Sequence, residues 1–309
     1  MKIVIALGGN ALGDSPAEQK ELVKVPAQKV ATLAQAGHTV VIGHGNGPQV
    51  GMIFNAFADA KKVNSKTPLV PFAEAGGMSQ GYIGYHMLAA IQTELNKLNV
   101  KKDVVYFETL TYVDPNDPAF QKPTKPVGPF YPTLAEAEAA NPGSTIVEDA
   151  GRGYRVVVPS PKPIDFLGIN AIKQSIDNGA IAIFGGGGGI PTVNHDGVVT
   201  GLDGVIDKDF TCAKIAEKID ADVFVILTAV DHVFVNWGKP NQLGLETATV
   251  AQMEQYIAEN QFAPGSMLPK VQAAINFVKG KPGKKAIIAD LKDIEKALKG
   301  EIGTAIIAD

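Results

Sequence analysis

The chain has 309 residues, of which 45% are hydrophobic and 19% charged, a composition typical of a folded globular protein and not of a disordered or fibrous one. Its formal net charge of -4, with Lys and Arg scattered along the chain, predicts no surface that would bind nucleic acid. No apolar run is long enough for a signal peptide or a membrane span, so we expect a cytoplasmic location and no membrane partner.

A series of apolar runs rich in Val and Ile predicts strands that are buried on both faces of a sheet. These runs are Lys2–Leu7, Thr39–Ile42, Asp103–Phe107, Ala180–Phe184, Asp222–Leu227, Lys285–Ala289 and Thr304–Ala308. Helical patterns lie between them, at Pro26–Ala36, Ser79–Asn96, Phe210–Ile219, Val250–Glu259 and Met267–Val278. The alternation predicts an α/β fold with a mainly parallel central sheet and helices on both faces, in a single domain over residues 1–309.

Residues 112–163 interrupt this alternation with many prolines and only a short helical stretch near 133–140. Proline lacks the backbone donor that a sheet interior requires, so the segment is predicted to leave the sheet. It also contains aromatic residues, such as Phe130 and Tyr131, that can pack together. We therefore interpret the segment as a small inserted subdomain that acts as a lid, and not as a flexible linker.

Glycine-rich turns follow three of the predicted strands, at Gly8-Gly9, Gly45-Asn46-Gly47 and Gly185–Gly189. The carboxyl ends of parallel strands share one edge of a sheet, so the three turns should line one crevice. Glycine allows backbone N–H groups to converge on an anion there. Neither familiar nucleotide motif fits, because Asp14 replaces the Lys of a P-loop and Val50 replaces the last Gly of a dinucleotide fingerprint.

Three lysines are candidates for binding the charge of a phosphate. Lys208 stands between Asp207 and Asp209, where the two carboxylates either hold the ammonium group or only cap a helix start. Lys270 lies near the start of a later predicted helix and is otherwise interpreted as a solvent-facing residue. Lys125 is flanked by prolines that stiffen the inserted segment, as suits a cation carried by a lid.

Several motifs occur in a fixed order along the chain. They are Leu7–Ala11, His44–Gln49, Pro123–Pro126, Glu148–Arg155, Val158–Pro163, Gly185–Pro191, Ile206–Asp209 and Pro264–Lys270. Together they resemble the carbamate kinases of the amino-acid kinase family, from near the first residue to the last predicted strand. The resemblance implies a three-layer α/β/α sandwich with a protruding subdomain, a homodimer, and reversible phosphoryl transfer between ATP and carbamate with Mg²⁺. It also suggests ATP synthesis from ADP and carbamoyl phosphate in arginine or related nitrogen catabolism.

The resemblance further implies roles for individual residues. The carbamoyl phosphate end and the transferring phosphoryl group would be bound by Gly8, Gly9, Asn10, Gly45 and Asn46. The catalytic residues would be Lys208, Lys270, Asp209 and Lys125, with Asp209 orienting the first two lysines. The nucleotide would lie against Gly186, Gly187, Gly188, Trp237 and Met267. Trp237 stands where Tyr or Phe is usual in the family, and its ring would wall the pocket.

These residue types suit phosphoryl transfer, which depends on positioning and on neutralising the charge of the equatorial oxygens. Carbamate is already an anion and loses no proton on attack, so no catalytic base is needed. His44, the one potential base in the glycine turns, is interpreted as a packed turn residue. The histidines show no zinc-ligand spacing, and Mg²⁺ would bind mainly phosphate oxygens and water.

Three alternatives stay open at this point. Another kinase of the family would phosphorylate an acylamino acid, aspartate or a nucleotide, but the lid motif around Lys125 and the segment 151–154 favour carbamate. A nucleotide-binding regulator without turnover is disfavoured by the intact lysines, and a dehydrogenase by the missing fingerprint. Arg152 and Arg155 either tie the lid to the body or touch substrate, and the structural role is preferred.

Overall fold

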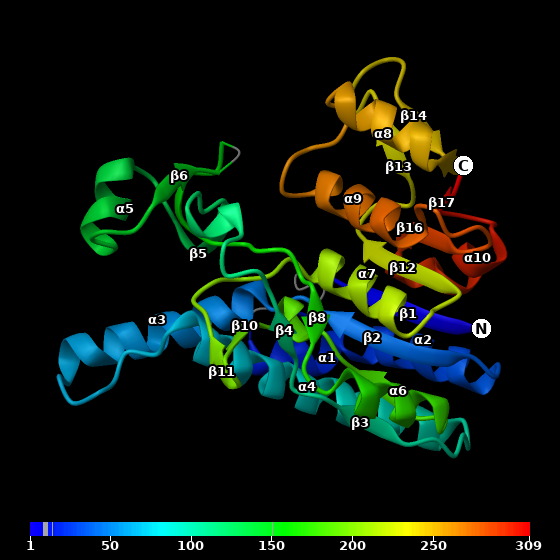
Figure 1. The fold of residues 1–309 in the computed structure, drawn as a ribbon, viewed down its shortest axis with the longest axis horizontal. Helices are drawn as coiled ribbons and strands as arrows, with labels where there is room; N and C mark the ends of the chain where they lie inside the picture. The colour runs from blue at the N-terminus through cyan, green and yellow to red at the C-terminus, as the bar shows by residue number, and fades with distance from the viewer. Residues whose placement is uncertain (9–11, 14, 150) are drawn as a thin grey trace.

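The computed structural model describes residues 1–8, 12–13, 15–149 and 151–309, and its centre is an eight-stranded sheet (Figure 1). In spatial order the strands are β15 (Thr247–Thr249), β17 (Thr304–Ile307), β16 (Lys285–Asp290), β12 (Val223–Thr228), β1 (Lys2–Leu7), β2 (Thr39–His44), β9 (Ile181–Ile183) and β3 (Val104–Tyr106). Neighbouring strands are parallel except β16 and β17. The predicted, mainly parallel sheet and its seven apolar strands are confirmed, whereas β15, with the sequence Thr-Ala-Thr, lacks an apolar run and was not predicted.

Two separate apolar cores lie against the two faces of this sheet. In β1, Val4 and Ala6 belong to one core, while Ile3, Ile5 and Leu7 belong to the other. All five side chains are at most 1% exposed. A strand in this position needs apolar residues at every position, which explains why it appears in the sequence as an unbroken apolar run.

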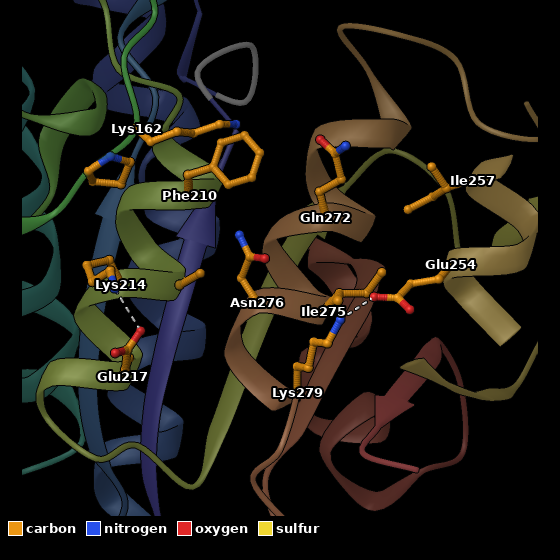
Figure 2. A pocket seen from close by; sticks show the side chains of 12 residues that line it. Lys162, Phe210, Lys214, Glu217, Glu254, Ile257, Gln272, Ile275, Asn276 and Lys279 are labelled. Carbon is orange, nitrogen blue, oxygen red and sulfur yellow. Dashed lines mark hydrogen bonds and ion pairs between the residues drawn. The ribbon is translucent and has the colours of Figure 1, made fainter. Parts of the chain in front are cut away.

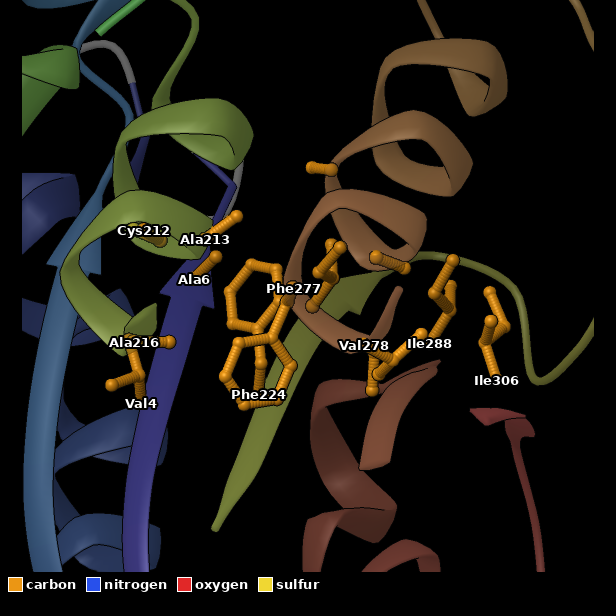
Figure 3. Close-up of a cluster of buried hydrophobic side chains, with 14 of the residues drawn as sticks. Val4, Ala6, Cys212, Ala213, Ala216, Phe224, Phe277, Val278, Ile288 and Ile306 are labelled. Carbon is orange, nitrogen blue, oxygen red and sulfur yellow. The ribbon is translucent and has the colours of Figure 1, made fainter. Parts of the chain in front are cut away.

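Helices cover both faces and complete the predicted sandwich. One core is closed by α6 (Ile169–Asp177), α7 (Lys208–Lys218), α8 (Val250–Ala258) and α9 (Met267–Val278), and the other by α2 (Lys24–Gln35), α4 (Phe72–Lys97) and α10 (Ile294–Lys299). Figure 3 shows the first core, where Phe224 of β12 meets Phe277 of α9 with ring centroids 5.8 Å apart. In the described part of the chain, no helix combines the length and apolarity needed to cross a bilayer.

A second, four-stranded sheet is absent from the sequence-based prediction. Its strands, in order, are β11 (Val198–Gly201), β10 (Ile190–His195), β4 (Leu110–Tyr112) and β8 (Asp165–Phe166). Strands β4 and β8 pair antiparallel at the two ends of the proline-rich segment. They therefore bring the points where that segment leaves and returns next to each other.

The proline-rich segment folds into a small three-stranded sheet with a helix, and it projects away from the main sheet (Figure 1). Its elements are β5 (Lys125–Tyr131), α5 (Leu134–Ala140), β6 (Ile146–Glu148) and β7 (Tyr154–Val158). Pro126 and Pro129 both lie in β5, which is an edge strand, where proline is tolerated. Helix α3 (Gly47–Val63), which was not predicted, runs from the end of β2 and packs against β5.

The predicted meeting of the glycine turns follows from the strand order. Strands β1, β2 and β9 are neighbours and parallel, so Gly8, Gly45 and Gly185 all follow the same edge of the sheet. The Gly45 amide donates to the Leu7 carbonyl at 2.9 Å, which joins two of the turns directly. This edge carries the candidate site.

Candidate active site

Asp209 joins two lysines that come from different helices. Its carboxylate accepts a hydrogen bond from Lys208, beside it at the start of α7, and at 2.9 Å from the Nζ of Lys270 in the first turns of α9. Asp209 is only 2% exposed. A buried carboxylate of this kind needs such partners, and it holds the two ammonium groups close together.

Asp207 joins a third lysine to the same place. One of its oxygens caps α7 by accepting from the Asp209 amide at 2.9 Å, and the other accepts from Lys125 Nζ at 2.6 Å. Lys125 belongs to β5 of the subdomain, so this ion pair connects the subdomain to the start of α7. The sequence left two roles open for Asp207, which were capping the helix and holding an ammonium group, and the structure shows both.

The charges shift the pKa values of the central groups. Burial alone would raise the pKa of Asp207, but the ammonium groups of Lys125 and Lys208 outweigh it and lower the pKa well below its usual range. Burial would likewise lower the pKa of Lys208, but the Asp209 and Asp207 carboxylates raise it. Asp207 and Lys208 are therefore charged near neutral pH. In the ion pairs of the site, three lysine side chains face two carboxylates, a surplus of one positive charge.

A cavity of about 200 Å³ lies where these groups meet. Its wall contains all three lysines, both carboxylates, and Gly45, Asn46 and Gly187 from two glycine turns. Long α3 begins at this cavity, directly after Asn46, so its positive helix end also faces it. Cationic side chains and backbone amides thus surround a space suited to a small anion or a phosphoryl group.

Neighbouring atoms leave no room for a Cβ atom at several positions of the turn at 185–189. Gly187 has φ +61°, and a Cβ there would lie 2.1 Å from the Asn46 side-chain amide. A Cβ on Gly188 would lie equally close to the Ile206 carbonyl oxygen. The Gly188 carbonyl accepts hydrogen bonds from Thr111 and Thr211, which fix it below the cavity. Of the three glycines assigned to the nucleotide, only Gly187 lines the cavity.

Other predicted site residues lie outside this cavity. Gly8 directly follows β1 at the same sheet edge without lining the cavity, while Gly9 and Asn10 lie outside the described residues. Met267 packs on the first apolar core. Trp237 is 63% exposed beside the hairpin of β13 (Val233–Val235) and β14 (Leu243–Leu245), with its ring 5.3 Å from that of Phe234. Their nucleotide contacts stay predictions.

His44 and Cys212 are both buried beneath the turns. Burial is the main cause that lowers the pKa of His44 to about 4, so its ring is neutral at neutral pH. Burial also raises the pKa of the Cys212 thiol to about 12. The value for His44 agrees with its interpretation as a packed turn residue, and the raised pKa keeps the buried Cys212 thiol protonated and unreactive near neutral pH.

Arg155, for which the sequence preferred a structural role over contact with substrate, lies in the wall of the cavity. It donates two hydrogen bonds to the Gly128 carbonyl and pairs with Asp149 at 3.1 Å. Arg152 pairs with the same carboxylate at 3.0 Å. These contacts stay within the subdomain, so the arginines join its own strands, whereas the link to the body is made by Lys125.

A larger cavity, of about 730 Å³, lies between α7 and α9 (Figure 2). Its lysines are mostly neutralised: Lys214 pairs with Glu217 at 3.0 Å and Lys279 with Glu254 at 2.7 Å. Lys162 places its Nζ 3.2 Å from the centre of the Phe210 ring. None of the glycine turns reaches this cavity, so the smaller one is the better candidate for phosphoryl chemistry.

Comparison with known proteins agrees with this geometry. The chain is 56% identical over 306 residues to a carbamate kinase-like protein of Mycoplasma pneumoniae and 50% identical to a carbamate kinase of Staphylococcus haemolyticus, covering 99% of each chain in both pairs. The solved carbamate kinase of Giardia lamblia bound to AMP-PNP superposes with a TM-score of 0.90 at 42% identity, covering 100% of this chain and 98% of that one. A model of the amino acid kinase family matches residues 1–290, and the chain therefore belongs to the amino acid kinase family.

Proposed function

We propose that this chain is a carbamate kinase, which transfers the γ-phosphoryl group of ATP to carbamate and reverses the reaction. The observation that carries the proposal is the meeting of Lys125, Lys208 and Lys270 on one small cavity with glycine turns on its other side. The names of the similar proteins support carbamate as the substrate.

In the forward direction a carbamate oxygen forms a bond to the γ-phosphorus, and the bond from that phosphorus to the β–γ bridging oxygen breaks. The electron pair leaves with ADP, and carbamoyl phosphate is the other product. In reverse, an oxygen of the ADP β-phosphate attacks the phosphorus and carbamate leaves. Neither direction removes a proton from the nucleophile, which agrees with the absence of any role for neutral, buried His44.

The residue roles follow from the position of each group. Lys208 and Lys270, oriented by Asp209, would neutralise the phosphates, and Lys125 would bring a further charge from the subdomain, which acts as a lid. The carbamoyl phosphate end would be bound by Gly8, Gly9, Asn10, Gly45 and Asn46. The nucleotide would extend from Gly186, Gly187 and Gly188 toward Met267 and Trp237, whose exposed ring is available to stack on a base.

Mg²⁺ would enter with the nucleotide. Asp207 and Asp209 are already paired with lysines, and the described residues contain no cluster of three or more His, Cys, Asp or Glu side chains that suits a metal. The ion would therefore be held by phosphate oxygens and water. When bound, it supplies further neutralisation of phosphate charge.

The proposal extends to the biological setting. We place the enzyme in the cytoplasm as a homodimer that makes ATP from carbamoyl phosphate during arginine or related nitrogen catabolism. Sedimentation equilibrium measures the mass of the particle, and a mass of one 32.4 kDa chain at micromolar concentration would contradict the dimer.

A coupled assay for ATP made from ADP and carbamoyl phosphate tests the activity. Lys208→Ala and Lys270→Ala are each expected to lower kcat/KM by ~10²-fold or more, because each removes a preorganised charge. Lys214→Ala, on the same helix as Lys208 but paired with Glu217, is the matched control and should keep near-normal activity.

The same assay separates the alternatives. No ATP from the wild type would support a regulator without turnover, and phosphorylation of acetylglutamate, aspartate or UMP in preference to carbamate would support another kinase of the family. Near-normal turnover of both Lys208→Ala and Lys270→Ala would overturn the roles given to these lysines.

A further inference from the structure

Asn46 lines the cavity, and a hydrogen bond holds its side chain in one orientation. Its Nδ2 lies 2.8 Å from the Oγ of Ser79, a fully buried residue of α4. The same Ser79 Oγ lies 2.7 Å from the Gly76 carbonyl oxygen. Asn46 itself is 6% exposed and lines the cavity together with Gly187.

The orientation of the Asn46 amide follows from counting protons. A serine hydroxyl has one proton, and the Gly76 carbonyl can only accept, so the Ser79 proton is used in that contact. Toward Asn46, the Ser79 Oγ can then only accept a hydrogen bond. The Asn46 group that faces it must be the NH₂, and the carbonyl oxygen Oδ1 is the other arm of the amide.

Oδ1 of Asn46 forms no hydrogen bond with any residue that the structure describes, although the side chain is almost completely buried. A Cβ on Gly187 would lie 2.6 Å from it, so only glycine at that position leaves the amide its space. Oδ1 is not among the fully buried side-chain atoms that lack a partner, so it stays accessible. An acceptor in such a place can receive a hydrogen bond from a ligand that brings a donor.

Carbamate brings that donor. Its planar group has two oxygens, which suit the lysines and the backbone N–H groups at the start of α3, and an NH₂ that can only donate. We infer that Asn46 Oδ1 accepts a hydrogen bond from the NH₂ of carbamate, and that Ser79 is a positioning residue that selects this group by holding the amide in place. The inference rests on the proposed carbamate kinase activity.

Acetyl phosphate is the probe for this selection, because it has a methyl group where carbamoyl phosphate has NH₂. Bound in the same pose, it would leave Oδ1 without a partner, which costs roughly tenfold or more in affinity. The kcat/KM for ATP formation from ADP is measured with each phosphoryl donor. Acetyl phosphate is also titrated as a competitive inhibitor, so that its binding is measured whether or not it is turned over.

Ser79→Ala removes the acceptor for Asn46 Nδ2, so the side-chain amide of Asn46 is free to rotate by 180°. We expect the preference for carbamoyl phosphate over acetyl phosphate to fall about tenfold, mainly through lower kcat/KM for carbamoyl phosphate. Ser79→Thr keeps the hydroxyl and should restore most of the preference. Thr93→Ala removes a hydroxyl bound to the Ala89 carbonyl on the same helix, far from the site, and should change neither value.

Different failures have different meanings. If the wild type makes no ATP from carbamoyl phosphate, the proposed function and this inference are both overturned. If the wild type is active and Ser79→Ala lowers kcat/KM and binding for both donors in the same proportion, Ser79 has only a packing role and the inference alone is wrong.

Discussion

Asp209 is buried, which disfavours its charge, and it pairs with two lysine ammonium groups, which stabilise that charge. Its two lysines come from α7 and α9, and Lys270 lies 61 positions along the chain from Asp209, so the carboxylate also fixes the distance between the starts of these helices. A buried carboxylate stripped of either lysine would be left with an unbalanced charge. The ion pairs therefore have a structural role in addition to any role in binding.

His44 gives a pH-dependent prediction at the same scale. With a pKa of about 4 in the folded protein and an ordinary value of 6.5, the folded state resists a proton that the unfolded chain accepts. The free energy of unfolding should therefore fall as pH drops from about 6.5 toward 4, and His44 should account for about 2 kcal/mol between pH 7 and 4.5. His44→Gln, which cannot titrate, should remove that part of the loss.

Urea unfolding at pH 7 and at pH 4.5 measures this loss in the free energy of unfolding. His195→Gln is the control, since this side chain is 88% exposed. An equal pH-dependent loss in wild type and His44→Gln would show that His44 takes up its proton in the folded protein.

At the scale of elements, the site is built where helix starts meet the ends of neighbouring strands. Helices α3, α7 and α9 begin at the cavity, and the turns after β2 and β9 complete it. The amino ends of these helices add partial positive charge to that of the lysines. The turn after β9 has no room for side chains, so its conformation and the position of Asn46 depend on each other.

Gly187→Ala tests this dependence. The new Cβ would collide with the Asn46 amide, so kcat/KM with carbamoyl phosphate should fall by ~10²-fold through misplacement of that side chain. Gly197→Ala is the matched control, because Gly197 also has positive φ, at +86°, but faces open space. It should show only the backbone strain of about 1 kcal/mol in thermal unfolding, with unchanged kcat/KM. Equal activity of the two variants would contradict the proposed crowding.

The prediction from sequence succeeded where the signal was local. Strands such as Lys2–Leu7 are apolar at every position because both faces are buried, and the meeting of the glycine turns follows from parallel pairing alone. The second sheet was missed because its strand Asp165–Phe166 has two residues and leaves no pattern. The contact of Ser79 with Asn46 joins residues 33 positions apart in the sequence. Nothing in the local sequence of its helix distinguishes Ser79, so this contact could not be predicted.

At the scale of the whole molecule, the subdomain stands away from the main sheet and is connected to α7 by the Lys125–Asp207 ion pair (Figure 1). The two side chains are 32% and 14% exposed, so the pair is partly shielded from solvent. This ion pair adds to the packing of β5 against α3, which also holds the subdomain to the body.

Lys125→Met should therefore loosen the subdomain without unfolding the main domain. Hydrogen exchange of backbone amides in β5 and β7 is expected to become about fivefold faster, while exchange in β1 and β12 stays unchanged. Lys122→Met, at an exposed position of the same segment, should alter neither. Unchanged exchange in Lys125→Met would mean that other contacts hold the subdomain.

The sharing of two carboxylates among three lysines also has a consequence for the turnover of product. The single surplus positive charge attracts the phosphate, while every lysine keeps a carboxylate partner after the phosphate departs. Tight binding during transfer is therefore compatible with rapid release of the product.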